Sequence, residues 1–205
     1  MRKKTKNIVK RPSWDELFMM TAILVATRHS CLKRGVGSCI VKDNKIVATG
    51  YNGAAKGIKS CLELGYCYYE HLAEQEVRTN GGDIKMIKES FKMYCQAVHA
   101  EANAKSQCLP MVAEGSTIYI TNVPCPKCTQ DIIITGGVKA IVVWKEYLQN
   151  YTLTTDEKKV TDKKLQQAGI ALRFLDLTSH RIMEIAGYMA NRVGERLDYQ
   201  FKGGG

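Results

Sequence analysis

Two cysteines stand three residues apart in the segment Pro124-Cys125-Pro126-Lys127-Cys128, and His99 precedes them in the chain. At the start of a helix, residues three apart lie on the same side and can grip one ion. A catalytic zinc takes three protein ligands and keeps a fourth position open for water. Because His99, Cys125 and Cys128 supply that number, the sequence predicts a catalytic zinc site with these three ligands.

Glu101 follows His99 by two residues, and side chains at that spacing point to different sides of an ideal helix. The two side chains can therefore converge on one site only if His99 lies where a loop becomes a helix. The pattern H-x-E followed by P-C-x-x-C is typical of zinc deaminases, in which a zinc-bound hydroxide attacks C4 of cytosine. We expect Glu101 to move protons from the water to a ring nitrogen and then to departing ammonia.

Each motif by itself also has a simpler interpretation. A lone C-x-x-C also fits half of a structural zinc site or a redox pair, and a lone H-x-E carries almost no information. The two motifs together, in this order and with a strand just before the second, favour the catalytic site.

The chain has 205 residues and a net charge of +10, with 45% hydrophobic residues. Six of the positive charges lie in residues 1–12, which we expect to be a basic, disordered leader, so that about +4 remains for the rest. No segment has the length and apolarity of a membrane span or a secretory signal. We therefore expect a cytoplasmic protein with no membrane contact, and we expect nucleic acid not to be its partner.

The hydrophobic pattern predicts alternating helices and strands. Ser13 and Glu16 predict a capping box for the first helix, and Asp43-Asn44 predicts the tight turn of a hairpin. Residues 53–95, rich in Gly, Cys and Tyr, are expected to be irregular. Strands are expected at 36–41, 45–49, 117–121, 139–144 and 170–175. Helices are expected at 13–29, 98–108, 125–135, 156–168 and 182–198. This order predicts an α/β fold, one mixed sheet with helices on both faces, in a single domain over residues 13–205.

The chain resembles the deoxycytidylate (dCMP) deaminases of the cytidine deaminase superfamily. The resemblance is carried by five segments: RPSWDELFM (11–19), VGSCIVKDNKIVATGYNG (36–53), AVHAEANA (97–104), TIYITNVPCPKC (117–128) and GGVKAIVVWKEY (136–147). It implies a three-layer α/β/α fold with about five strands, a homo-oligomer such as a hexamer, and hydrolysis of dCMP to dUMP for thymidylate supply. It also implies regulation by dCTP and dTTP, with Mg²⁺ accompanying the triphosphate effector.

The resemblance also suggests two substrate-binding residues. Asn52 matches a position that touches the nucleotide sugar, and Tyr147 matches an aromatic near the pyrimidine. Read from the residues alone, Asn52 could instead make the turn after a strand, and Tyr147 could cap the core. The segment Thr121-Asn122-Val123 departs from the common family pattern, which leaves the details of the substrate loop open.

A second, structural zinc is a further expectation. Some dCMP deaminases hold such a zinc with cysteines at matching places, and a closed site needs four ligands. This chain has four cysteines that could serve: Cys31, Cys61, Cys67 and Cys95, with His71 as a substitute for Cys67. The alternative is that they are small buried hydrophobic residues. Cys39 and Cys108 are expected to serve packing alone.

Two other functions compete with dCMP deamination. The basic leader is compatible with a zinc deaminase that acts on a base within a nucleic acid. A non-enzymatic zinc-stabilised binding module is the third reading, but Glu101 would have no use in it. The apolar stripe of the last helix, which includes Ile182, Ile185 and Met189, is expected to pack on its own domain, with an oligomer contact as the alternative.

Overall fold

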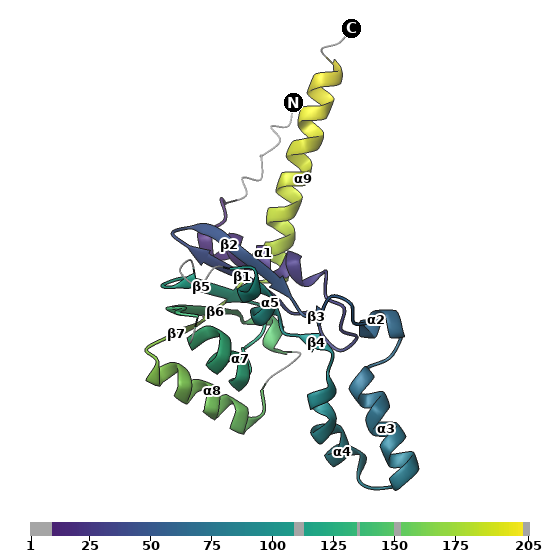
Figure 1. Cartoon of the computed structure of the whole chain (residues 1–205). Coiled ribbons are helices and arrows are strands. Elements are labelled where there is room, and N and C mark those ends of the chain that lie inside the picture. Colours follow the sequence, from purple (N-terminus) through teal and green to yellow (C-terminus); the bar gives the residue numbers. More distant parts are fainter. Residues whose placement is uncertain (1–9, 109–112, 135, 150–152, 203–205) are drawn as a thin grey trace.

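The core of the protein is a mixed five-stranded sheet (Figure 1). The computed structural model describes residues 10–108, 113–134, 136–149 and 153–202. The strands are β1 (Gly37–Lys42), β2 (Lys45–Tyr51), β5 (Thr117–Ile120), β6 (Ala140–Trp144) and β7 (Ala171–Leu175). Their order is β2-β1-β5-β6-β7, with antiparallel pairing from β2 to β5 and parallel pairing from β5 to β7. The predicted mixed sheet of about five strands is confirmed.

The turn between β1 and β2 is the predicted one. Asp43 and Asn44 both have positive φ, 50° and 57°. A two-residue turn with both residues in this region matches the twist of the flanking strands, and Asn and Asp tolerate it well. The hairpin therefore forms where its sequence places it.

Helices cover both faces of the sheet, because alternate strand residues point to opposite sides. Cys39 and Val41 of β1 pack with Phe18 and Met19 of helix α1 (Trp14–Ala26). Ile40 of β1 lies on the other side, in a cluster that includes residues of α5 (Ala100–Ser106) and α8 (Thr155–Gln167). The three-layer α/β/α arrangement expected from the resemblance is the one observed.

The first helix begins as predicted and ends earlier. Ser13 and Glu16 form the predicted capping box, with each side chain bonded to the other residue's backbone N–H. The helix ends at Ala26, three residues before the expected end at residue 29.

Residues 53–95 are not irregular, and that prediction was wrong. They contain α2 (Cys61–Leu64), α3 (Tyr68–Asn80), α4 (Ile84–Phe91) and a 3₁₀ turn, η1 (Lys92–Tyr94). We call residues 61–95 the arm. Its helices α3 and α4 lie side by side and project from the sheet (Figure 1). A short pairing of β3 (Gly53–Ala54) with β4 (Ala97–Val98) joins the chain on either side of it.

The arm is stabilised by caps and ion pairs rather than by a core of its own. Ser60 and Glu63 form a capping box for α2, and Asp83 accepts two backbone hydrogen bonds at the start of α4. Lys88 of α4 pairs with Glu74 of α3 at 3.2 Å. Of the arm's residues, only Cys61 and Ala73 are fully buried. Apolar residues do recur at helical spacing in α4, at Ile84, Ile87 and Phe91, a signal that the prediction of an irregular segment passed over.

The last helix, α9 (Ser179–Lys202), begins three residues before the predicted helix and continues beyond it. Its first turns pack on the domain: Ile185 is buried, and Arg181 pairs with Glu16 of α1 at 2.9 Å. Its later turns project away from the sheet (Figure 1). Most of the predicted leader, residues 1–9, lies outside the described residues. No helix in the described part of the chain combines the length and apolarity needed to cross a membrane.

Candidate metal centre and substrate cavity

His99, Cys125 and Cys128 meet at one point. Their ligand atoms all lie within 4.8 Å of one another. The Nδ1 atom of His99 is 3.2 Å from the Cys128 sulfur and 3.6 Å from the Cys125 sulfur. Within the described ranges, no other set of three or more His, Cys, Asp or Glu side chains forms a group compact enough to hold a metal ion.

The spacing of these atoms fits zinc. With Zn–S of about 2.3 Å and Zn–N of about 2.0 Å, the corners of a tetrahedral site lie roughly 3.5–3.8 Å apart. The two observed S···N distances fall at or just below that range. One nitrogen and two sulfurs also form the donor set of several catalytic zinc sites. The three residues could therefore hold a zinc ion and leave its fourth position free.

Two helix starts bring the three donors together. His99 is the N-cap of α5, with φ −70° and ψ 153°, and Cys125 is the N-cap of α7 (Pro126–Cys128). The Cys125 sulfur accepts a hydrogen bond from the Cys128 N–H at 3.5 Å. The predicted single helix over 125–135 is instead the short α7 followed by a π-helical stretch, η2 (Thr129–Ile134). Such π-helical turns occur frequently at functional sites.

Glu101 shares the site because His99 is not inside the helix. The extended backbone of His99 turns its imidazole back toward the first turn of α5, where Glu101 lies. Glu101 is 4% exposed, and it lines the same cavity as His99 and Cys125. Burial raises the pKa of its carboxyl, while the charge of His99 acts in the opposite direction. A carboxyl in this environment holds a proton more readily than an exposed one, which suits a group that must accept and return a proton.

The two thiols of the centre ionise unequally. A hydrogen bond with Cys128 is the main reason that the pKa of the Cys125 thiol is lowered, and His99 contributes to the shift. The same interaction raises the pKa of Cys128, so the pair shares a proton. The hydrogen bond with Cys125 also raises the pKa of His99. A thiolate is the form of cysteine that binds metal, so Cys125 is prepared for that role.

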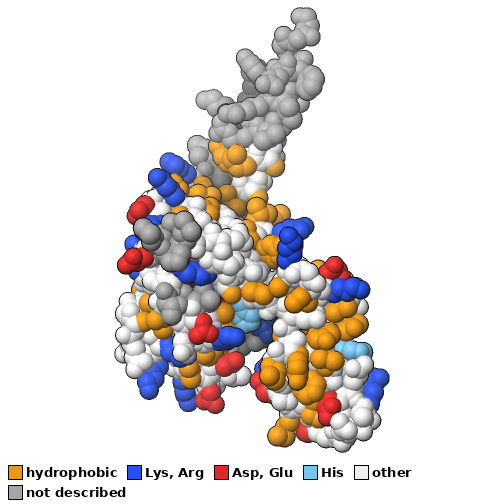
Figure 2. All heavy atoms as spheres, viewed as in Figure 1, with side chains coloured by type: hydrophobic (Ala, Val, Ile, Leu, Met, Phe, Trp, Pro, Cys, Tyr) orange, Lys and Arg blue, Asp and Glu red, His pale blue; other side chains and the backbone are white. Residues whose placement is uncertain are grey.

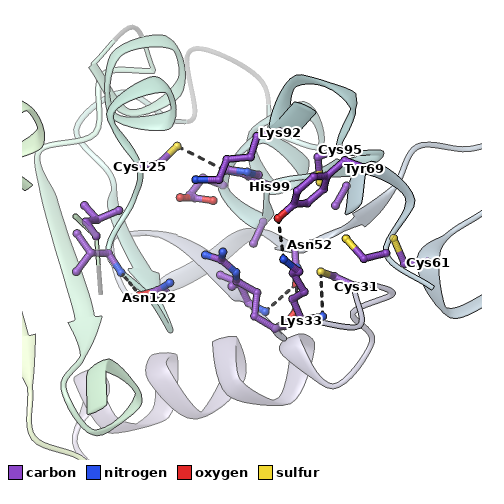
Figure 3. Close-up of a pocket in the computed structure, with 18 of the residues that line it drawn as sticks. Cys31, Lys33, Asn52, Cys61, Tyr69, Lys92, Cys95, His99, Asn122 and Cys125 are labelled. Atoms are coloured by element: carbon purple, nitrogen blue, oxygen red, sulfur yellow. Dashed lines mark hydrogen bonds between the residues drawn. The ribbon is translucent and has the colours of Figure 1, made fainter. Parts of the chain in front are cut away.

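A cavity of about 300 Å³ opens at the metal centre (Figure 3). Glu101 and Asn122 lie among its lining residues, and three cationic side chains line it as well: Lys33, Arg34 and Lys92. Sequence reasoning did not single out these cations. Lys33 and Arg34 could have been found as a basic pair shortly before the first strand of the hairpin, β1.

Asn52 lines the cavity, but its amide also holds a neighbouring loop. The Asn52 side chain accepts a hydrogen bond from the Val36 N–H at 2.7 Å and donates one to the Arg34 carbonyl at 3.0 Å. Tyr147, in the 3₁₀ turn η3 (Glu146–Gln149), donates its hydroxyl to the Gly35 carbonyl at 2.7 Å and is not among the residues that line the cavity. Both residues therefore contact the backbone of residues 34–36.

The four cysteines expected at a second zinc all line the same cavity, and Figure 3 shows Cys31, Cys61 and Cys95 on the same side of it. They come from the loop after α1 and from the arm: Cys31, Cys61, Cys67 and Cys95. They do not form a compact ligand group in the described structure. His71 is not a lining residue, and it stacks on Tyr66 instead. Cys39 and Cys108 belong to the core, which confirms their packing role.

Comparison with known proteins agrees with this geometry. The family model "Cytidine and deoxycytidylate deaminase zinc-binding region" matches residues 12–145, a range that includes His99, Glu101, Cys125 and Cys128. Deoxycytidylate deaminase of Mycobacterium phage D29 is 34% identical over 67% of this chain and 99% of its own length. Deoxycytidylate deaminase of Saccharomyces cerevisiae is also 34% identical, but the match covers 82% of this chain and only 46% of that protein.

A solved structure shares the fold. The dCMP deaminase of cyanophage S-TIM5, in complex with dCMP and dUMP, has a TM-score of 0.52 and 26% identity, and the match covers 81% of this chain and 99% of that one. By its sequence match, its sheet and its His-Cys-Cys centre, the chain belongs to the cytidine and deoxycytidylate deaminase family.

Proposed function

We propose that the chain is a zinc-dependent dCMP deaminase, which hydrolyses dCMP to dUMP and ammonia. One observation carries the proposal: a compact His-Cys-Cys donor group and a buried carboxyl open into the same cavity as three cationic side chains. The donor group and carboxyl suit deamination of a base. The cations suit a substrate that bears a phosphate.

The chemistry divides between the metal and the chain. Zinc held by His99, Cys125 and Cys128 would supply activation of a water molecule as the nucleophile at neutral pH. Glu101 takes a proton as the water oxygen attacks C4 and gives that proton to ring nitrogen N3. It then transfers the second water proton to the amino group. The C4–N bond breaks, ammonia departs, and the carbonyl of dUMP remains.

The burial of Glu101 supports this assignment. A carboxylate whose pKa is raised by burial is a stronger base than an exposed one, so it takes a proton from activated water more readily and holds it until it is delivered. Because His99 is the N-cap of α5 and Glu101 lies in its first turn, the same helix start orients the metal ligand and the proton carrier.

A direct assay tests the proposal. The zinc-loaded full chain is incubated with dCMP, and the loss of cytosine absorbance is followed. Glu101→Gln should lower kcat by roughly 10²–10⁴-fold while zinc content stays the same. Glu114→Gln, an exposed glutamate away from the cavity, is the matched control and should retain full turnover. No turnover of dCMP by the wild type, or full turnover by Glu101→Gln, would show that the proposal is wrong.

The same assay separates the competing functions. A single-stranded DNA oligonucleotide that contains cytosine takes the place of dCMP. Turnover of the oligonucleotide with none of dCMP would favour a nucleic-acid deaminase. Zinc binding without turnover of either substrate would favour the non-enzymatic module.

We further propose the second, structural zinc at Cys31, Cys61, Cys67 and Cys95. Its support is that all four cysteines line the same cavity, one from the loop after α1 and three from the arm. Burial is the main cause that raises the pKa of Cys95, and Cys31 and Cys61 add to it, which indicates that these sulfurs are neighbours. A metal would fix the base of an arm that has almost no buried core.

Regulation by dCTP and dTTP, Mg²⁺ with a triphosphate effector, a homo-oligomer such as a hexamer and a place in the cytoplasm stay predictions from the sequence. Thymidylate supply would follow from the product, because dUMP is its precursor. Titration of the assay with dCTP and dTTP, with and without Mg²⁺, tests the first of these.

A further inference from the structure

The backbone around Cys125 can be held mainly through its carbonyls. Pro124 and Pro126 have no N–H group, so their backbones accept hydrogen bonds from neighbouring elements but cannot donate one. Cys125 lies between them with an extended backbone, φ −69° and ψ 162°, as is usual for a residue before proline. We call residues 124–126 the metal segment. The position of its cysteine depends on the groups that donate to these carbonyls.

A threonine and a lysine of α8 supply two of these donors. The Thr161 hydroxyl donates to the Pro124 carbonyl at 3.4 Å, and the Lys164 ammonium donates to the Pro126 carbonyl at 3.3 Å. Lys164 also donates to the side-chain oxygen of Gln130 in η2. The helix α8 therefore contacts the metal segment on both sides of its cysteine.

The carbonyl of Cys125 itself is held within its own turn. It accepts the Thr129 N–H at 2.9 Å and the Thr129 hydroxyl at 3.0 Å. These bonds fix the local shape of the turn, but they move with it. The two donors of α8, by contrast, tie the metal segment to a separate element of the fold.

The buried face of α8 carries a polar residue where packing alone would favour an apolar one. Within this helix Thr161 and Leu165 are buried, and residues four apart lie on the same face. Leu165 packs in the core, whereas Thr161 is 0% exposed and directs its hydroxyl to the metal segment. Threonine is a weak helix former, and a buried hydroxyl costs free energy unless it has a partner. The contact with Pro124 therefore accounts for a threonine at this position.

The rest of α8 faces solvent. Figure 2 shows charged side chains of both signs over this helix, at the lower left of the molecule. The exposed charged residues are Asp156, Lys158, Lys159, Asp162 and Lys163. Glu157, one turn before Thr161, lines the cavity instead. Since Glu157, Thr161 and Lys164 lie at positions i, i+4 and i+7, one face of α8 extends from the cavity to the metal segment, beside α7 (Figure 1).

We propose that Thr161 and Lys164 are positioning residues of the metal centre. By holding the carbonyls on either side of Cys125, they keep its sulfur at the 3.6 Å distance from His99 Nδ1 that suits zinc. The inference rests on the proposed function, which assigns zinc to this centre, and deepens it. Neither residue lines the cavity, so both act through the metal ligand and not on the substrate.

The size of the effect follows from the contacts. Partners that orient the ligands of a metal commonly change metal affinity about 10–100-fold. Both contacts of α8 are long for hydrogen bonds, and they act on the backbone of a ligand rather than on its sulfur. We therefore expect loss of either donor to weaken zinc binding about three- to fivefold, and loss of both about tenfold or more.

Zinc affinity of the full chain tests the positioning role without any substrate. The metal-free protein is titrated with zinc in competition with a chromophoric chelator, and the binding step that Cys61→Ser leaves unchanged belongs to the His99 centre. Thr161→Val keeps the side-chain shape and loses the hydroxyl, and Lys164→Met loses the ammonium. Each variant and their combination should weaken that step as stated above. Thr161→Ser and Lys164→Arg retain a donor and should recover most of the affinity.

Cobalt in place of zinc gives a spectroscopic readout of ligand geometry. The visible absorption bands of bound Co²⁺ should change in Thr161→Val and Lys164→Met relative to the wild type, and Thr161→Ser should restore them. Ser116→Ala is a matched control, because it removes a buried hydroxyl that donates to the Ala113 carbonyl at 2.6 Å. Lys163→Met, at an exposed lysine of the same helix, is the other. Both controls should keep the wild-type zinc affinity and cobalt spectrum.

The outcomes separate this inference from the proposed function. If Thr161→Val and Lys164→Met keep the wild-type zinc affinity and cobalt spectrum, the positioning role is refuted and the deaminase stands. If the wild type binds zinc but does not deaminate dCMP, the proposed function fails, and the zinc affinities still decide the positioning role. Equal weakening by Ser116→Ala would reveal a general effect of lost stability and would also overturn the role. Lys164 is only partly buried, so Lys164→Met decides the question if Thr161→Val does not fold.

Discussion

The hydroxyl of Tyr147 donates a 2.7 Å hydrogen bond to the carbonyl of Gly35, and so joins the turn after β6 to the loop before β1. The Tyr147 ring also stacks on Trp144, with ring centroids 5.7 Å apart. Since Gly35 follows Arg34 directly, this hydrogen bond helps to fix the position of Arg34, a cationic residue that lines the cavity, relative to the end of the sheet. The aromatic that the resemblance placed near the pyrimidine thus supports the cavity wall from behind.

Replacement of Tyr147 by Phe removes that hydrogen bond and keeps the ring. We expect the free energy of unfolding to fall by about 1 kcal/mol, since the Gly35 carbonyl loses its partner. We also expect KM for dCMP to rise several-fold, with kcat less affected, because Arg34 becomes less fixed. Urea denaturation and steady-state kinetics measure the two effects. Tyr94→Phe, an exposed tyrosine of the arm, is the control, and identical behaviour of the two variants would contradict the positioning role.

The second zinc gives a prediction in metal stoichiometry. The purified chain should contain two zinc ions, and Cys61→Ser should contain one, because Cys61 is the buried member of the four cysteines. The variant should keep its catalytic zinc while the arm becomes more sensitive to proteolysis. Metal analysis and limited proteolysis measure these changes. Cys108→Ala, in the core, should still bind two. A wild type with one zinc, bound at the His99 centre, would remove the second site.

The sequence was sufficient to predict that His99, Cys125 and Cys128 come together, and it predicted most of the sheet. The motifs H-x-E and P-C-x-x-C identify the His-Cys-Cys group, because the two motifs together are typical of zinc deaminases. The position of His99 as an N-cap followed from the two-residue offset of Glu101. The Asp43-Asn44 turn was equally predictable, since its backbone requires positive φ.

The arm and the basic side of the cavity were not predictable in the same way. The helices α3 and α4 bury only Ala73 between them, so almost none of their apolar residues belongs to the core. The ends of the arm's helices nevertheless carry typical residues. Gly65 and Gly81, both with positive φ, are the C-caps of α2 and α3, and Asp83 caps the start of α4. The approach of Lys92 to the site depends on how the arm folds back. No local spacing encodes that contact.

Asp15 gives a prediction about pH. Its carboxylate accepts hydrogen bonds from the Tyr119 hydroxyl at 2.6 Å and from Arg173 at 2.9 Å. The Arg173 hydrogen bond is the main reason that the pKa of Asp15 is lowered in the folded protein. A folded pKa below the unfolded value of about 3.9 means that the unfolded chain binds the proton first on acidification. The stability from Asp15 is therefore present above about pH 4 and is lost as the pH falls through the folded pKa.

Asp15→Asn should accordingly be less stable than the wild type by about 1 kcal/mol at pH 7, a value kept small because the Arg173 side chain is half exposed. The difference should shrink as the pH falls below about 4. Urea denaturation of both proteins, with zinc content matched at each pH, measures it. A difference in the free energy of unfolding that stays constant as the pH falls would show that the charge of Asp15 does not contribute to stability.

Gly50 of β2 packs directly against the backbone of α5, the helix that His99 caps. A substitution at Gly50 therefore tests how the fold positions the site. A Cβ atom on Gly50 would lie 2.3 Å from the Ala100 carbonyl and 2.3 Å from the Ala104 nitrogen, both in the backbone of α5. Backbone atoms cannot turn aside as a side chain does, so Gly50→Ala must push α5 away from β2. The Ala100 carbonyl would then move from the Ser38 hydroxyl, which donates to it at 2.8 Å.

We expect Gly50→Ala to lose at least about 1–3 kcal/mol of stability from overpacking, and also to lose activity and zinc affinity, since α5 begins at His99. Gly187→Ala in α9 is the control, because a Cβ there meets nothing within 4 Å. That variant should gain up to about 1 kcal/mol from helix propensity and leave activity unchanged. Urea denaturation, zinc titration and the dCMP assay are run on both. If Gly50→Ala loses stability but keeps its zinc affinity and turnover, α5 does not transmit the packing of the sheet to the metal centre.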